Sequence, residues 1–258
     1  MSDYIDTLAM DAALTIDSGY YHATDSKKQP KVSLKKAIQD CKTNPVIAEI
    51  KAASPSLGTI RCIINPKEIA QAMQRVGAVG ISVLTEPIHF NGSLSNLSDV
   101  RAAVKLPILM KDIVIVPEQI EVAAQLGANA VLLIQALFDK RYCEMTVDKM
   151  VAYAHSKGLE VLLETHTVGE FKKAVETDAD LIGINNRSLA TLKIDLSTTK
   201  EILEKHGKAG KTVISESGIK TKADLQFLRD CGADAFLIGS SIMLSDNVED
   251  KVKEFVEA

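Results

Sequence analysis

The sequence contains no tryptophan, few aromatic residues and no large surplus of charge. Aromatic residues make up 4% of the 258 positions, and 30 Lys and Arg residues are matched by 34 Asp and Glu residues. A nucleic-acid-binding protein more often has a basic surplus or a clustered basic stripe, so nucleic acid is not an expected partner. A 46% hydrophobic and 25% charged composition is typical of a globular domain and excludes a disordered or collagen-like chain.

Closely spaced cysteines and long apolar runs are also missing. The cysteines form no CxxC pair and have no histidine at metal-ligand spacing, being scattered at Cys41, Cys62, Cys143 and Cys231. We therefore expect reduced thiols in a cytoplasmic protein, rather than a disulfide scaffold or a zinc site. No apolar run is long enough for a signal peptide or a membrane helix, so no membrane association is expected.

Short apolar, β-branched runs recur along the chain. They are nearly continuous in hydrophobicity, as expected of strands covered on both faces. We count eight: Val46–Ile50, Gly80–Leu84, Ile108–Met110, Ala130–Ile134, Glu160–Leu163, Leu181–Ile184, Thr212–Ser215 and Ala235–Ile238.

Helical periodicity fills the stretches between these runs, and several helices end at a glycine just before the next strand, as at Gly77, Gly127 and Gly232. Strand–helix units in one undivided chain of this length predict an α/β fold, a (β/α)8 TIM barrel, over residues 45–258. A doubly wound open sheet is the alternative, but no GxGxxG follows the first strand. We expect residues 1–44 to be a short N-terminal extension that packs on the barrel and covers its bottom, with a helix from Ser33 to Lys42.

Polar residues cluster at the expected carboxyl ends of the strands, where such barrels carry their chemistry. Each of these side chains could simply contact solvent. Several strands, however, bring their polar ends together at one opening of the barrel, and such a cluster of charged groups is suited to acid–base catalysis on a polyfunctional substrate. The residues concerned are Glu49, Lys51, Lys111, Glu164, Asn185, Arg187, Glu216 and Ser217.

Small residues follow the last two strands, at Ser217-Gly218 and Gly239-Ser240-Ser241. Backbone N–H groups there would approach an anion, and barrels commonly hold phosphate at this place. We expect the long loop Ala52–Asn65 to act as a lid, and Phe90 either lines an aromatic pocket or packs within its own loop. The five histidines form no HExxH motif and have no GxSxG partner, so we expect neither a zinc hydrolase nor a histidine-containing site.

These segments together resemble indole-3-glycerol phosphate synthase. The resemblance extends from about Pro45 to Met243, and its segments are VIAEIKAASPS (46–56), SVLTE (82–86), FNGS (90–93), ILMKD (108–112), AVLLI (130–134), IGINNR (182–187), ISESGI (214–219) and FLIGSSIM (236–243). It implies ring closure on 1-(o-carboxyphenylamino)-1-deoxyribulose 5-phosphate, with loss of CO₂ and water. It implies a phosphorylated small-molecule substrate and no metal or organic cofactor. We expect a monomer.

The resemblance also implies roles for individual residues. Lys111 would be the general acid at the ribulose carbonyl oxygen, its pKa lowered by burial and a neighbouring cation. Glu164 would transfer protons in the dehydration, and Lys51 would hold the substrate's charge and serve as a second acid. The remaining assignments are Glu49 and Asn185 to assist Glu164, Arg187 to the anthranilate carboxylate, Glu216 and Ser217 to positioning, and Ser54, Gly218, Gly239 and Ser240 to phosphate.

The sequence departs from the family at Ala52 and Ser188, where a basic residue and an aspartate are usual, and in its acidic, polar opening segment. None of these departures removes an expected catalytic residue. Two other functions remain open from the residues alone. One is a different phosphosugar enzyme, either an isomerase or a Schiff-base aldolase using Lys111 or Lys51. The other is a non-catalytic barrel that binds a phosphorylated ligand or a partner enzyme.

Overall fold

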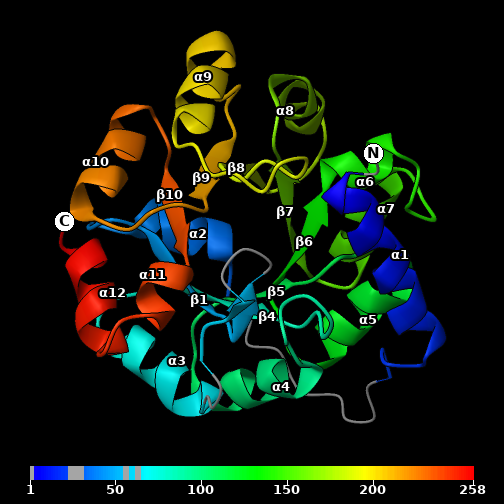
Figure 1. Cartoon of the computed structure of the whole chain (residues 1–258), viewed down its shortest axis with the longest axis horizontal. Coiled ribbons are helices and arrows are strands. Elements are labelled where there is room, and N and C mark those ends of the chain that lie inside the picture. Colours follow the sequence, from blue (N-terminus) through cyan, green and yellow to red (C-terminus); the bar gives the residue numbers. More distant parts are fainter. Residues whose placement is uncertain (1–2, 23–31, 55–57, 62–64) are drawn as a thin grey trace.

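A closed barrel of parallel strands forms the centre of the protein (Figure 1). The computed structural model describes residues 3–22, 32–54, 58–61 and 65–258. Within them the barrel order is β1-β10-β9-β8-β7-β6-β5-β4, which confirms the predicted (β/α)8 architecture. The strands are β1 (Val46–Ile50), β4 (Gly80–Leu84), β5 (Ile108–Lys111), β6 (Ala130–Ile134), β7 (Glu160–Thr165), β8 (Leu181–Asn185), β9 (Thr212–Glu216) and β10 (Ala235–Ile238).

Four of these strands run further than predicted, and each extension ends at a polar residue. β5, β7, β8 and β9 continue to Lys111, Thr165, Asn185 and Glu216. These residues keep their sheet partners, as Leu84 pairs with Lys111 and Asn185 pairs with Glu216. The polar side chains therefore stand on regular sheet backbone and not on loops, which fixes their direction.

Helices surround the barrel and alternate with its strands (Figure 1). Asn65 caps α3 by accepting from the N–H of Glu68, and Thr221 caps α10 by accepting from the N–H of Asp224. The surrounding helices are α3 (Pro66–Arg75), α4 (Leu94–Ala103), α5 (Pro117–Gln125), α6 (Gln135–Asp139), α7 (Val147–Ser156), α8 (Val168–Val175), α9 (Ser197–His206), α10 (Lys222–Asp230), α11 (Ser240–Met243) and α12 (Val248–Val256).

The barrel strands bury both of their faces. Ile47, Leu109 and Leu132 belong to one apolar cluster, together with residues of the N-terminal extension. Their neighbours along the strands, such as Ala48 and Met110, belong to a second cluster that includes the surrounding helices. This alternation follows from the period of two along a strand, and it explains why the strand sequences are almost uniformly apolar.

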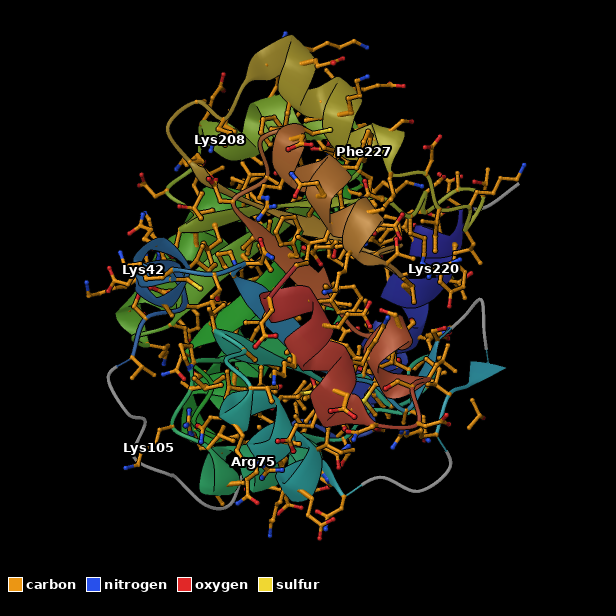
Figure 2. All side chains as sticks on the ribbon, turned by 90° about the vertical axis from the view of Figure 1, so that its left-hand side faces the viewer. Lys42, Arg75, Lys105, Lys208, Lys220 and Phe227 are labelled. Atoms are coloured by element: carbon orange, nitrogen blue, oxygen red, sulfur yellow. The ribbon has the colours of Figure 1, made fainter. Side chains whose placement is uncertain are left out.

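The N-terminal extension reaches both ends of the barrel. Helix α2 (Leu34–Asp40) lies at the amino ends of the strands, where Glu160 accepts hydrogen bonds from the backbone N–H groups of Leu34 (2.7 Å) and Lys35 (3.1 Å). Helix α1 (Tyr4–Asp17) lies at the carboxyl ends, where the Tyr4 hydroxyl is 2.8 Å from Nδ1 of His89. Figure 2 shows α2 beside Lys42 and α1 on the opposite side, with Lys220.

The expectation that this extension as a whole covers the bottom of the barrel is therefore wrong for α1. The reason is a set of polar contacts with loops at the carboxyl ends. Tyr20 donates a hydrogen bond to the carbonyl of Thr85 (2.9 Å), and Tyr21 donates one to the Asp112 carboxylate (2.9 Å). These partners follow β4 and β5, so residues just after α1 are tied to the mouth of the barrel.

The loop after β1 contains a small antiparallel pair, β2 (Ala53–Ser54) and β3 (Gly58–Thr59). Arg61 fastens its far end, donating to the carbonyls of Met243 (2.7 Å) and Ser245 (2.6 Å). Residues 55–57 and 62–64 of the predicted lid, including Pro55 and Ser56, lie outside the described residues. Among the helices that are described, none has the length and apolar character needed to cross a membrane.

Candidate active site

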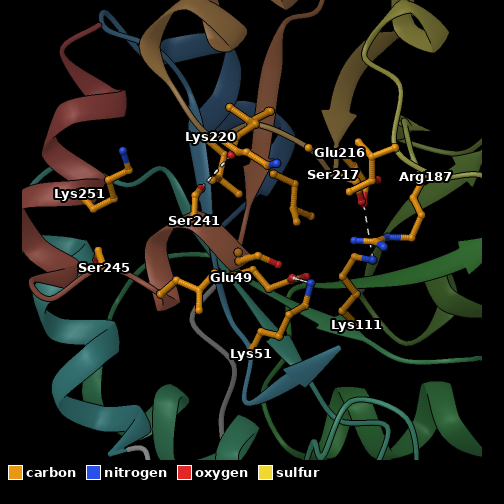
Figure 3. Close-up of a pocket in the computed structure, with 18 of the residues that line it drawn as sticks. Glu49, Lys51, Lys111, Arg187, Glu216, Ser217, Lys220, Ser241, Ser245 and Lys251 are labelled. Atoms are coloured by element: carbon orange, nitrogen blue, oxygen red, sulfur yellow. Dashed lines mark hydrogen bonds and ion pairs between the residues drawn. The ribbon is translucent and has the colours of Figure 1, made fainter. Parts of the chain in front are cut away.

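Two cavities meet at the carboxyl ends of the barrel strands. The larger has a volume of about 670 Å³ and the smaller about 80 Å³. Four residues line both cavities, and they come from the end of β5 and from the loops after β1, β8 and β9: Lys51, Lys111, Arg187 and Ser217. Figure 3 shows these side chains gathered from separate strands around the larger cavity. A ligand with one polar and one apolar part would span the junction between the two.

Lys111 stands at this junction among carboxylates. Its Nζ lies 3.2 Å from Oε2 of Glu164 and 3.6 Å from Oε2 of Glu216. Burial alone would lower the pKa of Lys111, but attraction to Glu164, Glu216 and Glu49 outweighs it and raises the pKa well above its usual value. The expected lowering by a neighbouring cation is therefore wrong, since the groups around the ammonium are anionic.

Glu164 and Glu216 share Lys111 but have opposite pKa shifts. Burial opposes ionisation of Glu164, yet Lys111 and His166 together hold the pKa of that carboxyl far below its usual range. Burial and repulsion from Glu164 raise the pKa of Glu216 to about 8, despite the attraction of Lys111. Two carboxyl groups in one site thus differ in protonation at neutral pH, an arrangement suited to one acid and one base.

Glu216 faces the larger cavity without a hydrogen-bond partner in the described part of the chain. A side chain at position 183 would collide with its carboxyl group, so the glycine of β8 leaves room for it. Lys111 lies 3.6 Å away, an ion pair beyond hydrogen-bond distance, and a buried carboxyl group without a hydrogen bond is costly unless a ligand supplies one. Glu216 is therefore placed to bind the ligand itself.

Glu49 and Lys51 form the second charged pair of the site. Lys51 Nζ lies 2.7 Å from Glu49 Oε1, and Ser82 donates a hydrogen bond of 3.3 Å to the other oxygen of Glu49. The predicted sharing of one strand face by these two residues is confirmed by this contact. Glu49 is buried and Lys51 is partly exposed, so the ammonium is the member of the pair that a ligand reaches first.

The predicted phosphate residues separate into two groups. Gly218, Gly239 and Ser240 line the larger cavity, whereas Ser54 is buried and lines the smaller one. Ser217 has a φ of 66°, which is unusual for a residue with a side chain and marks a strained turn at the site. Sequence reasoning missed Lys220 and Lys251, which line the larger cavity and add positive charge beside the glycine turns.

The smaller cavity is mostly apolar. Phe90 lines it, as predicted, together with Glu164 and Asn185. Sequence reasoning missed its other apolar walls, which include Leu132, Ile134, Leu189 and, from α1, Tyr4 and Leu8. The signal for α1 was present in the apolar spacing of residues 5, 8, 9 and 12, but nothing local indicates which end of the barrel this face covers.

Arg187 and Asn185 lie at the edge of this cavity. Asn185 Oδ1 accepts the backbone N–H of Arg187 at 3.0 Å, and the Arg187 side chain donates to the Leu192 carbonyl at 3.4 Å. Burial lowers the pKa of Arg187, although nearby Glu49 opposes this shift. The guanidinium stays charged and can pair with an anionic ligand group.

One histidine also belongs to the site, contrary to expectation. His166 Nε2 lies 3.2 Å from Oε1 of Glu164, and His166 Nδ1 lies 3.3 Å from Oε2 of Glu170. The signal was the i, i+2 spacing of Glu164 and His166, which places both on one face of an extended strand. No group of three residues suited to hold a metal ion occurs in the described ranges.

Comparison with known proteins agrees with this geometry. The model of the family "Indole-3-glycerol phosphate synthase" matches residues 10–255. The indole-3-glycerol phosphate synthase of Methanocaldococcus jannaschii is 46% identical over 236 residues, covering 90% of this chain and 86% of that protein. The enzyme of the same name from Aquifex aeolicus is 42% identical over 222 residues, covering 86% and 84%.

Solved structures with little sequence similarity share the fold. A thiamine phosphate pyrophosphorylase from Pyrococcus furiosus is 14% identical with a TM-score of 0.62, covering 86% of this chain and 96% of that one. An N-acetylmannosamine-6-phosphate 2-epimerase from Clostridium perfringens is 15% identical with a TM-score of 0.61, covering 84% and 93%. These likenesses concern architecture alone. By the family match and the close relatives, the chain belongs to the indole-3-glycerol phosphate synthase family of carboxy-lyases in tryptophan biosynthesis.

Proposed function

We propose that this chain closes the indole ring of 1-(o-carboxyphenylamino)-1-deoxyribulose 5-phosphate with Lys111 as the general acid. The observation that carries the assignment is the position of Lys111 at the junction of the two cavities, in contact with Glu164 and Glu216. The sugar phosphate would occupy the larger cavity and the carboxyphenyl ring the smaller one. The carbonyl to be attacked then lies between them, beside the ammonium.

The ring-closing step needs an acid that is charged when the substrate binds. The aryl carbon forms a bond to the ribulose carbonyl carbon, and the electron pair of the carbonyl moves to its oxygen, which takes a proton from Lys111. The surrounding carboxylates keep Lys111 protonated. The developing alkoxide is a far stronger base than an amine, so the transfer is favourable despite the raised pKa. Departure of CO₂ then returns an electron pair to the ring.

The dehydration needs a base and a second acid. Glu164 is held ionised and would take a proton from the methylene carbon next to the new hydroxyl. Lys51 would give a proton to the departing hydroxyl, which leaves as water. Glu49 keeps Lys51 oriented through their 2.7 Å contact, and Asn185 would align the substrate beside Glu164.

Substrate binding uses both cavities. Arg187 lines each of them and would pair with the anthranilate carboxylate, while Gly218, Gly239 and Ser240 would hold the phosphate. Ser54 does not line the phosphate side, so its proposed contact would require movement of the loop after β1. Glu216 and Ser217 would position the sugar hydroxyls.

A Schiff-base aldolase is the alternative that the residues left open. It requires a neutral amine as nucleophile, and the raised pKa of Lys111 opposes this. Fluorescence distinguishes the two functions. Because the chain has no Trp, indole emission that appears with the carboxyphenylamino substrate would report product directly. Borohydride trapping of substrate on the protein, without indole emission, would favour the aldolase.

The expectations of a cytoplasmic location and a monomeric state stay predictions. Light scattering on the purified protein would test the monomer.

A further inference from the structure

His89 joins two residues of helix α1 through the two nitrogens of one imidazole. Nδ1 lies 2.8 Å from the hydroxyl of Tyr4, and Nε2 lies 2.8 Å from Oδ2 of Asp11. Tyr4 and Asp11 are seven positions apart, close to two helical turns, so both lie on the same side of α1. The rings of Tyr4 and His89 also meet edge to face, with their centroids 5.5 Å apart. We call these three residues the α1 clamp.

The hydrogen bonds of the α1 clamp have a defined direction. A carboxylate only accepts, so Nε2 of His89 carries the hydrogen that faces Asp11, and Nδ1 of the neutral imidazole accepts from the Tyr4 hydroxyl. Burial, together with the nearby Glu86 and Asp11, raises the pKa of Tyr4 to about 12, so the hydroxyl keeps the proton that it donates. Tyr4 is therefore not prepared to act as a base or nucleophile, and its contact with His89 holds the side chain in place.

Glu86 fixes the loop that carries His89. This buried residue follows β4, and its carboxylate accepts the backbone N–H groups of Ile88 (2.9 Å), His89 (2.7 Å) and Phe90 (3.0 Å). The backbone at His89 therefore has little freedom to move. The α1 clamp thus fastens Tyr4 to a loop that is itself held in place.

The α1 clamp borders the smaller cavity of the reaction site. Tyr4 and Phe90 line this cavity, whereas His89 and Asp11 are not among its lining residues in the described part of the chain. Aromatic rings pack favourably against one another, so an aryl group bound in this cavity would contact both Tyr4 and Phe90. His89 can act on such a ligand only through Tyr4.

We propose that His89 and Asp11 are positioning residues that hold the Tyr4 ring as a wall of the smaller cavity and thereby set the affinity for the aryl part of the substrate. The inference rests on the proposed function, because that function places the carboxyphenyl ring in this cavity.

Helix α1 has other attachments to the barrel. Ile5, Ala9 and Ala12 are buried in the apolar cluster that also contains Ile47 and Leu109. The Tyr142 hydroxyl donates a hydrogen bond of 3.0 Å to the carboxylate of Asp6. Loss of the α1 clamp should therefore change the placement of the Tyr4 ring without detaching the helix.

The test compares the binding of two unreactive ligands by isothermal titration calorimetry. One is the substrate analogue in which the ribulose carbonyl is reduced to an alcohol, and the other is ribitol 5-phosphate, which lacks the aryl group. The Kd of ribitol 5-phosphate divided by the Kd of the analogue gives an aryl ratio, which measures the contribution of the aryl group to binding.

Tyr4→Phe and His89→Phe each keep a ring but remove the hydrogen bond between these residues. We expect the aryl ratio to fall about three- to tenfold in both variants, the range for one hydrogen bond, while the Kd of ribitol 5-phosphate stays unchanged. Asp11→Ala should also lower the aryl ratio, because the imidazole loses its second partner.

The double variant Tyr4→Phe/His89→Phe tests whether His89 acts through Tyr4. Its aryl ratio should equal that of either single variant, because the two residues share one hydrogen bond. Additive losses in the double variant, or an unchanged aryl ratio in His89→Phe or Asp11→Ala, would overturn the proposal.

Tyr142→Phe is the matched control. It also removes a tyrosine hydroxyl that is bonded to α1, but Tyr142 is not among the described residues that line the smaller cavity. We expect an unchanged aryl ratio. A fall as large as that in His89→Phe would mean that any loosening of α1 has this effect, which contradicts a specific role for His89.

Failure of the inference and failure of the proposed function give different results. If the unchanged protein binds the analogue more tightly than ribitol 5-phosphate but forms no indole from the substrate, the proposed function fails and the role of the α1 clamp stands. If it forms indole but binds both ligands equally, the inference fails and the proposed function stands.

Discussion

The carboxylate of Glu49 occupies the space into which a side chain at position 239 would extend. A Cβ atom on Gly239 would overlap Oε1 of Glu49 and lie 3.1 Å from its Cβ. The two residues meet because β1 and β10 are neighbours in the closed barrel, with Ala48 paired to Ile238. The glycine expected to serve phosphate binding therefore also makes room for the pair Glu49–Lys51.

Replacing Gly239 by alanine should therefore damage turnover as well as substrate binding. The added methyl group displaces Glu49 and disturbs its 2.7 Å contact with Lys51. We expect kcat to fall by at least about tenfold, within the range for a disturbed acid–base group, and KM to rise. Steady-state kinetics measure both. A rise in KM with unchanged kcat would mean that the glycine serves the phosphate alone.

Gly169→Ala is the control for that substitution. Gly169 lies in α8 without a positive φ, and a Cβ there would meet only the Thr167 hydroxyl, at 4.0 Å. We expect unchanged activity and a free energy of unfolding that is equal or up to about 1 kcal/mol higher.

The two lysines should differ in their kinetic signatures. Lys111→Met should lower kcat by about 10²–10⁴-fold, the range for loss of a general acid, with little change in affinity for an unreactive substrate analogue. Lys51→Met should impair both affinity and kcat, because Lys51 is expected to hold substrate charge. If Lys111→Met keeps near-normal turnover while Lys51→Met is inactive, the two roles must be exchanged.

Glu216 should make the protein less stable as pH rises. Its pKa is raised from 4.5 to about 8 in the folded state, so above pH 4.5 the unfolded chain loses this proton while the folded chain retains it. The contribution of Glu216 to the free energy of unfolding therefore falls between about pH 4.5 and 8. In Glu216→Gln this pH-dependent loss of stability should be absent. The Tm of the variant should therefore rise relative to that of the unchanged protein as the pH increases. Parallel Tm curves for the two proteins between pH 5 and 9 would contradict the shift.

Helix α1 should matter for the substrate as well as for stability. Leu8 is buried and lines the smaller cavity, whereas Met10 on the same helix is 65% exposed. Leu8→Ala should raise KM and lower the free energy of unfolding by about 2–5 kcal/mol. Met10→Ala should change stability by less than about 0.5 kcal/mol. Equal KM values for the two variants would place α1 outside the binding site.

The sequence predicted the barrel well because its strands are apolar on both faces. Runs such as Val46–Ile50 and Ala130–Ile134 match the observed strands in full. The predicted strands that ended too early did so at a polar residue, as before Lys111 and Glu164. A polar residue normally ends a buried strand, but here the cavity at the mouth of the barrel accommodates it.

The electrostatics of the site were harder to predict. The carboxylates that raise the pKa of Lys111 come from β1, β7 and β9, so no local pattern around Lys111 reveals them. The place of α1 was also missed, because Thr85 and Asp112, the partners of Tyr20 and Tyr21 just after this helix, lie far along the chain. Local sequence therefore predicted which residues line the site. It did not predict how their charges shift one another's pKa values, because those residues come from strands that are distant in the sequence.

Closure of the barrel between its first and last strands bears on how the enzyme is made in the cell. Glu49 and Gly239 are about 190 positions apart, and joining such distant segments carries a large entropic cost. Because β1 is synthesised before β10, one edge of β1 has no strand partner until β10 follows. A nascent chain that stops before β10 therefore lacks both the wall of the larger cavity that Leu237 and Ile238 form and the neighbour that confines Glu49. Catalytic competence and protection of that exposed edge are therefore gained together, once β10 is added.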